Sequence, residues 1–104
     1  MRVFVSRIDE GIVGFCATRR LDTETVELAG MIVRQHCLGK GVGSSLFEEA
    51  KKAAVASGFA AMIVKTESAN KRALLFYAGK GFVEQGQVVE ELNNAKVNLS
   101  VKEM

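Results

Sequence analysis

The feature that most constrains the fold of this chain is a change in hydrophobic spacing on either side of a glycine-rich loop. Residues 26–33, VELAGMIV, form an apolar run with the composition of a strand. From Val42 the apolar side chains recur instead at helical intervals, on the face made by Leu46, Phe47, Ala50, Ala53 and Ala54. A second apolar run, residues 59–66, follows Gly58 and predicts a buried strand. Strand, helix and strand in this order predict a right-handed crossover that joins two parallel strands.

The remaining segments predict two hairpins and a second helix. The turn residues Asp9–Gly11 separate two extended segments near the start of the chain, and LDTET at residues 21–25 predicts the next turn. Asn70 is a suitable cap for a helix over residues 71–80, which Gly81 ends. A closing hairpin is predicted around Asn93–Asn94. The expected fold is therefore α/β (α+β), a mixed sheet with two helices in the order β-β-β-α-β-α-β-β, and residues 1–104 are expected to form a single domain.

Charge and composition narrow the classes of function. Fourteen Lys and Arg against twelve Asp and Glu give a net charge of +2, far from the basic surface that non-specific nucleic-acid binding requires. Cys16 and Cys37 cannot form a disulfide framework, and no spaced Cys/His set is present to hold zinc, so no metal site is expected. The first ten residues lack the apolar core of a signal peptide, and no run is long enough to span a membrane. We therefore expect a cytoplasmic protein with reduced thiols and with no nucleic-acid or membrane partner.

The glycine-rich loop, RQHCLGKGVGSSL at residues 34–46, has the features of an anion-binding site. Gly39, Gly41 and Gly43 allow the backbone to turn tightly and to approach a ligand closely. The first amides of the following helix have no intrahelical acceptor, and together with the helix dipole they favour a phosphate or pyrophosphate. Arg34 and Lys40 add positive charge at the rim. The alternative is a connection that only needs flexible residues, although three glycines in five positions are more than a turn requires.

Two common phosphate-binding motifs do not fit this loop. A P-loop requires a glycine followed by Lys and a hydroxyl residue, whereas Lys40 precedes the later glycines. The dinucleotide fingerprint G-x-G-x-x-G has Ser44 or Leu46 at its third glycine, depending on the register, and it normally follows the first strand of a doubly wound sheet. The ligand must therefore be identified from a longer stretch of the sequence.

Residues 26–82 as a whole resemble the acetyl-CoA-binding core of the GNAT N-acetyltransferase superfamily. The family pattern is an apolar strand ending in Val, the loop motif [Q/R]-x-x-G-x-[G/A], a helix, a strand, and then N-x-x-A followed by Tyr and Gly-Phe. Val33 matches the strand end and Gly41 and Gly43 match the loop glycines. The second block is matched by Asn70, Ala73, Tyr77, Gly81 and Phe82. Leu38 stands at the Gln/Arg position, so backbone amides are expected to hold the ligand there. The family usually places a strand and two helices before the first hairpin, and this sequence begins at or near that hairpin.

The resemblance implies acetyl-CoA as cosubstrate and indicates which residues bind it. The third and fourth strands are expected to splay apart around the pantetheine arm, and Gly30 to mark a bulge in the first of the two. The pantetheine is expected to bond to the backbone of Met31, Ile32 and Val33. Asn70 is expected to reach the cofactor at the second helix. The pyrophosphate is expected at the loop residues Leu38, Gly39, Lys40, Gly41, Val42, Gly43 and Ser44.

The resemblance also implies two catalytic residues. Tyr77, the only tyrosine, is expected to be the general acid that protonates the departing thiolate; without the motif it would be a packing residue of an apolar helix. Glu27 is the candidate general base, with Glu24 and Glu67 as less well placed alternatives and a chain of water molecules as another. The backbone amide at or beside Val33 is expected to polarise the thioester carbonyl.

The adjacent His36 and Cys37 suggest a different chemistry, in which the cysteine attacks the acyl group. Neighbouring side chains rarely face each other, and both residues lie in the loop expected to hold the phosphate. A covalent acyl-cysteine is therefore not the favoured mechanism. Cys16 is expected to be a small core residue of the second strand.

Together these features predict an enzyme, a GNAT-type N-acetyltransferase (acyltransferase) that moves acetyl from acetyl-CoA to a primary amine by direct attack. The alternatives are a non-catalytic acyl-CoA-binding or dimerisation module and, more remotely, another phosphate-ligand protein such as a nucleotide binder. The sequence does not identify the acceptor, which is a small-molecule or protein amine. Glu84, Glu90 and Glu91 are available to attract a cationic acceptor, although a solvated hairpin face explains them more simply. A homodimer is expected to complete the walls of the site.

Overall fold

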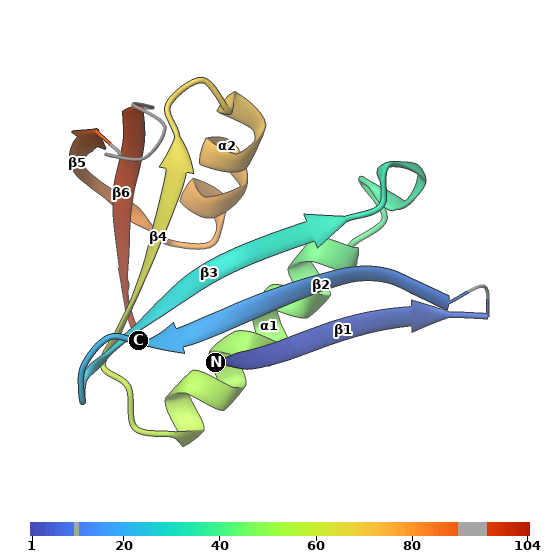
Figure 1. Ribbon diagram of the computed structural model, residues 1–104, viewed down its shortest axis with the longest axis horizontal. Helices are drawn as coiled ribbons and strands as arrows, with labels where there is room; N and C mark the ends of the chain where they lie inside the picture. Colours follow the sequence, from blue (N-terminus) through green and yellow to red (C-terminus); the bar gives the residue numbers. More distant parts are fainter. Residues whose placement is uncertain (10, 90–95) are drawn as a thin grey trace.

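The computed structural model describes residues 1–9, 11–89 and 96–104, and within them it shows one six-stranded sheet and two α-helices (Figure 1). The strands are β1 (Arg2–Ile8), β2 (Gly11–Arg20), β3 (Thr25–Val33), β4 (Ala61–Glu67), β5 (Val83–Val89) and β6 (Lys96–Glu103). The helices are α1 (Val42–Ala56) and α2 (Lys71–Gly79), and a short 3-10 helix, η1 (Gln35–Cys37), lies before α1. The predicted element order and the mixed α/β class are confirmed.

The strands lie in the order β1-β2-β3-β4-β6-β5. β3 and β4 are parallel, and every other neighbouring pair is antiparallel. The parallel pair confirms the crossover predicted through the first helix. The insertion of β6 between β4 and β5 was not predicted.

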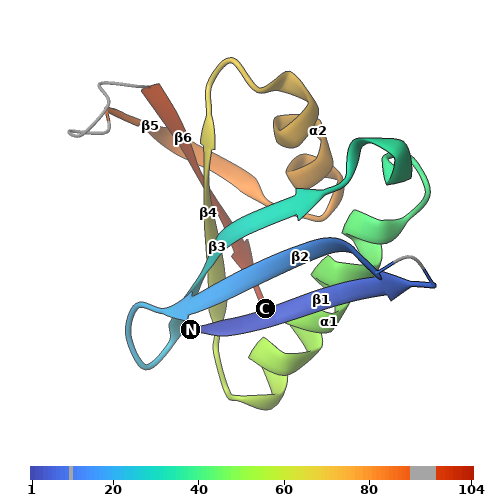
Figure 2. The same ribbon diagram turned by 45° about the vertical axis from the view of Figure 1, so that its right-hand side comes forward.

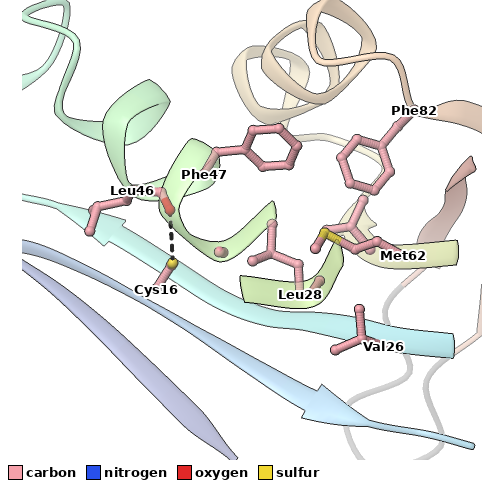
Figure 3. Close-up of a cluster of buried hydrophobic side chains, with 10 residues drawn as sticks. Cys16, Val26, Leu28, Leu46, Phe47, Met62 and Phe82 are labelled. Atoms are coloured by element: carbon pink, nitrogen blue, oxygen red, sulfur yellow. Dashed lines mark hydrogen bonds between the residues drawn. The ribbon is translucent and has the colours of Figure 1, made fainter. Parts of the chain in front are cut away.

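The core lies between α1 and the face of the sheet made by β2, β3 and β4, and Phe82 adds to it. Figure 2 shows α1 along one face of the sheet. Cys16, Phe47 and Met62 are the largest fully buried side chains, and Phe47 packs edge-on against Phe82 with ring centroids 5.9 Å apart (Figure 3). The face of α1 predicted to be buried is the one that faces this core. Burying a side chain such as Phe47 stabilises the fold by about 2–3 kcal/mol.

A bulge in β3 changes which of its side chains face the core. Ala17 pairs with Gly30 and Thr18 pairs with Leu28, so Ala29 is the extra residue, next to the glycine expected to mark a bulge. Before the bulge Val26 and Leu28 face α1, as their burial in the core cluster shows. After it the alternation is shifted by one residue, so that Met31 and Val33 pack against the core.

Beyond the bulge, β3 and β4 diverge. Their parallel pairing comprises Thr25–Leu28 with Ala61–Val64, although β3 continues to Val33 and β4 to Glu67. Figure 1 shows the two strands separating toward their carboxyl ends. The splay implied by the family resemblance is therefore present, and the ends of both strands are free to contact a ligand.

The ends of α1, β4 and α2 agree with the predictions to within two residues. α1 ends at Ala56, and Gly58 follows it with a φ of +86°, a backbone conformation that suits glycine. β4 begins at Ala61 instead of residue 59, and the amides of Ala60 and Ala61 both donate to the carbonyl of Glu24. Asn93–Asn94, Glu90 and Glu91 lie outside the described residues.

In the part of the chain that the structure describes, neither helix is long and apolar enough to cross a membrane.

Candidate acyl-CoA site

The loop before α1 presents uncapped backbone amides. Gly39 and Gly41 have φ values of +77° and +83°, in the left-handed region that only glycine adopts without strain. Gly41 is the N-cap of α1, and no side chain accepts a hydrogen bond from this end of the helix. Ser45 donates the first intrahelical bond, to the carbonyl of Gly41, so the preceding amides are available to a ligand. This arrangement, with the helix dipole behind it, favours an anion.

These amides open into a cavity of about 470 Å³ between the loop, the end of β3 and one side of α2. Its volume is within the range of small-molecule and cofactor sites. The cavity is lined by Met31, Val33, Cys37, Leu38, Gly39, Gly41, Val42, Gly43, Ser44, Asn70, Arg72, Ala73, Phe76 and Tyr77.

Most of the residues predicted to bind the cofactor line this cavity, but two do not. Ile32 is 61% exposed and lies on the face of the sheet away from α1, because the bulge at Ala29 shifts the alternation of β3. Its predicted contact was through the backbone, which the outward side chain does not contradict. Lys40 is exposed on the loop and does not line the cavity.

The sequence analysis did not predict that four further residues line the cavity, namely Cys37, Arg72, Ala73 and Phe76. Ala73 had been used only as part of the family motif. Ala73 and Phe76 lie three and six residues after Asn70, so the helical spacing of α2 was the available signal. A Cβ added to Gly43 would lie 3.6 Å from the ring of Phe76 and 3.7 Å from the sulfur of Met31. The loop, α2 and β3 therefore meet at Gly43, and this position has room for little more than a methyl group.

Asn70 lies at the cavity wall as the N-cap of α2. Its Oδ1 accepts a hydrogen bond of 3.1 Å from the amide of Ala73. The predicted cap is confirmed, and it satisfies one of the backbone amides that have no partner within the first turn of α2.

Tyr77 combines an aromatic contact with exposure to the cavity. Its ring is edge-on to Phe76 and Phe82, at centroid distances of 5.4 Å and 5.5 Å. Burial raises the pKa of the phenol above its usual value, and the nearby Cys16 raises it further. Tyr77 therefore keeps its proton at neutral pH and lies in a wall of the cavity.

Glu27 lies elsewhere. Its side chain is 8% exposed and forms an ion pair with Arg19, whose side chain is 54% exposed. The residue does not line the cavity; it is on the opposite face of β3, immediately before the position where β3 and β4 separate. Glu24 lies in the β2–β3 turn, and Glu67 is exposed at the end of β4.

The geometry around the two cysteines gives no support to an acyl-cysteine. His36 is exposed while Cys37 is buried, so the adjacent side chains do not face each other. Cys16 is fully buried in the core, as predicted, and burial raises the pKa of its thiol to about 11. Among the described residues, no three His, Cys, Asp or Glu side chains are grouped to hold a metal ion.

An uncapped helix start, next to a pair of parallel strands that diverge, is the arrangement expected of an acyl-CoA-dependent transferase. Residues 1–84 match the model of the acetyltransferase (GNAT) domain, and the chain belongs to this family. The resemblance seen in residues 26–82 is thereby confirmed.

Solved structures support the same fold. Ard1 from Thermoplasma volcanium superposes with a TM-score of 0.91 at 17% identity, over 96% of this chain and 68% of its own. A GNAT family acetyltransferase from Elizabethkingia anophelis, solved with acetyl-CoA bound, has a TM-score of 0.84 at 16% identity, over 98% of this chain and 75% of its own. A nourseothricin acetyltransferase has a TM-score of 0.89 at 20% identity, over 98% of this chain and 64% of its own. No curated protein sequence matches this chain.

Proposed function

We propose that this protein is an N-acetyltransferase that moves acetyl from acetyl-CoA directly to a primary amine. The observation that supports this most strongly is the uncapped start of α1, which opens into a cavity with Tyr77 in its wall. The binding of acetyl-CoA by a member of the same family supports the choice of cosubstrate.

The cavity is suited to hold the cofactor along its length. The amides of Gly41, Val42, Gly43 and Ser44 would bind the pyrophosphate, and Leu38, Gly39 and Lys40 would complete the loop around it. The backbone of Met31, Ile32 and Val33 would bond to the pantetheine arm, because this part of β3 has no partner on the β4 side. The N-terminal turn of α2, at Asn70, would border the cofactor on its other side.

The transfer requires a base, an oxyanion site and an acid. The acceptor ammonium loses a proton to Glu27 or to water, and its nitrogen then attacks the thioester carbonyl carbon. A backbone amide at or beside Val33 would stabilise the oxyanion. As the carbon–sulfur bond breaks, Tyr77 would donate its proton to the departing thiolate, giving CoA and the amide product.

Direct attack is favoured over a covalent route because neither cysteine is suited to act as a nucleophile. Cys16 is buried in the core and burial raises the pKa of its thiol, and Cys37 is buried whereas His36, the base that would have to activate it, is exposed.

The test combines thermal shift with a thiol-release assay. Acetyl-CoA is expected to raise the melting temperature, and a panel of primary amines is expected to contain acceptors that release CoA. Stabilisation without CoA release for any amine would identify a non-catalytic acyl-CoA-binding module. Absence of any stabilisation would refute both roles, and stronger stabilisation by ATP would identify a nucleotide binder.

We also propose a cytoplasmic homodimer. Within the described sheet β1 and β5 are edge strands, each with one row of backbone groups open to pairing with a second copy. Light scattering is expected to give twice the mass of the chain, and a monomer at all concentrations would contradict the proposal.

A further inference from the structure

The lining of the acyl-CoA cavity contains a charged side chain that the proposed function does not use. Among the described residues that line the cavity, Arg72 is the only one that is charged at neutral pH, and none is acidic. The side chain of Arg72 is exposed, and the structure shows no ion pair between it and a carboxylate of the described residues. Its guanidinium is therefore available to an anionic ligand.

Arg72 lies on the side of α2 that faces the cavity. Residues four apart share one face of a helix, and Phe76, four residues after Arg72, also lines the cavity. The neighbouring Lys71 lies on the other side of the helix, where it lines a second cavity with Leu74 and Ala78. The first turn of α2 therefore presents one cation to each side.

The starts of both helices add positive potential to the cavity. Lys71 and Arg72 occupy the first turn of α2, which contains no acidic residue, although the helix dipole favours acids and disfavours cations at this end. α1 also begins without an acidic residue, and its uncapped amides open into the same cavity. The cavity therefore has two positive regions, the loop amides and Arg72, and suits a ligand with two separate anionic groups.

Two other cations of the loop do not provide the second positive region. The Nε of Arg34 donates a hydrogen bond of 2.8 Å to the carbonyl of Ile12, and its backbone amide donates to the carbonyl of Val13. Neither Arg34 nor Lys40 lines the cavity. A second anionic group of a ligand bound at the loop would therefore meet Arg72.

Coenzyme A carries such a second anionic group. Its pyrophosphate is attached to the 5′ carbon of a ribose, and the same ribose carries a separate phosphate on its 3′ oxygen. With the pyrophosphate at the loop amides, the 3′-phosphate lies one sugar ring away from them. The thioester end of the molecule points in the other direction, along β3.

We propose that Arg72 binds the 3′-phosphate of CoA and thereby selects the acyl donor. The planar guanidinium is suited to donate two parallel hydrogen bonds to phosphate oxygens. A donor without the 3′-phosphate, such as a 3′-dephospho-CoA thioester or a thioester on the phosphopantetheine arm of a carrier protein, loses this contact. This inference rests on the proposed function, because it names the donor that the same transferase prefers.

The experiment compares CoA with 3′-dephospho-CoA by titration calorimetry, so that it measures binding without turnover. CoA is expected to bind about 5- to 20-fold more tightly to the wild-type protein, because a two-pronged contact with a phosphate is strong but water screens an exposed side chain. Arg72→Gln is expected to lower the affinity for CoA by the same factor and to leave the affinity for 3′-dephospho-CoA unchanged. The two ligands and two proteins form a cycle that isolates the contact between Arg72 and the 3′-phosphate.

Lys71→Gln is the matched control. It removes the same charge from the same turn of α2, but on the side that faces the second cavity, and the preference for CoA is expected to remain. Both substitutions are at exposed positions and exchange good helix formers, so both variants are expected to fold. Arg72→Lys keeps the charge but loses the planar fork, and it is expected to retain only part of the preference.

The outcomes separate this inference from the transferase. A preference for CoA that disappears in Arg72→Gln, in a protein that releases no CoA with any amine, would support the inference and refute the transferase. CoA release with equal affinity for the two ligands would support the transferase and overturn the inference. An equal loss of affinity for both ligands in Arg72→Gln would also overturn it, because Arg72 would then bind a group that the two ligands share. No binding of either ligand would refute both.

Discussion

Replacing Tyr77 by Phe removes a single hydroxyl and tests the general acid directly. The phenyl ring keeps its edge-on contacts with Phe76 and Phe82 at 5.4 Å and 5.5 Å, each worth about 0.5–1.5 kcal/mol beyond the area that it buries. The free energy of unfolding should therefore change by about 1 kcal/mol or less, the value of one hydrogen bond. The substitution therefore removes the proton donor and leaves the packing of the ring unchanged.

The expected loss of kcat is about 10²- to 10⁴-fold, the contribution of a positioned acid. This corresponds to about 3–5 kcal/mol of transition-state stabilisation, at 1.36 kcal/mol for each factor of ten. The dissociation constant of acetyl-CoA should change by less than threefold, since the loop amides that hold the pyrophosphate are unaltered. Kinetics by CoA release and calorimetry of acetyl-CoA binding measure the two quantities.

The pH dependence of kcat provides a second test of Tyr77 as the general acid. Burial raises the pKa of Tyr77 above its usual value of 10.0, and the acid is active while protonated. Its deprotonation should therefore reduce kcat only above pH 10 in the wild-type protein, and this alkaline limb should be absent from Tyr77→Phe. Phe59→Leu, a partly buried ring outside the cavity, is the control: it should lower the melting temperature with little effect on kcat. Wild-type turnover in Tyr77→Phe would refute the assignment.

Three further predictions concern the rest of the site. Asn70→Ala removes the cap of α2 and should destabilise the fold by about 1 kcal/mol, seen as a lower urea midpoint; an unchanged midpoint would mean that the cap is dispensable. Gly43→Glu should weaken acetyl-CoA binding at least tenfold by placing a carboxylate beside the pyrophosphate, whereas Gly43→Ala, whose methyl group fits 3.6 Å from Phe76, should weaken it far less; equal effects would show that charge is not the cause. Cys16, with a thiol pKa raised to about 11, should react with iodoacetamide at pH 8 only when the protein unfolds, and rapid labelling of the native protein by mass spectrometry would contradict its burial.

Local signals in the sequence were sufficient to predict the helices, the strands and the glycine-rich loop. Helical spacing from Val42, the glycines of the loop and the cap at Asn70 each depend on residues close together in the chain, and each is confirmed. The parallel pairing of β3 with β4 was predicted from the strand–helix–strand order, because a helical crossover commonly joins two parallel strands.

Features that depend on the register between strands could not be predicted from local sequence in the same way. The extra residue at Ala29 turns Ile32 outward and Met31 inward, and an uninterrupted alternation from Val26 would give the reverse. The partner of Glu27 is Arg19, eight residues earlier, which becomes its neighbour only once β2 and β3 are aligned. Likewise, β6 reaches its place beside β4 through non-local pairing that no local periodicity encodes.

The most direct test of the central claim is a ¹⁵N chemical-shift titration of the protein with acetyl-CoA. The account predicts that the largest amide shifts fall on Gly39, Gly41, Gly43 and Ser44 and on Met31–Val33, the loop and the unpaired end of β3. Shifts confined to β1 and β5, or no shifts at millimolar acetyl-CoA, would contradict it.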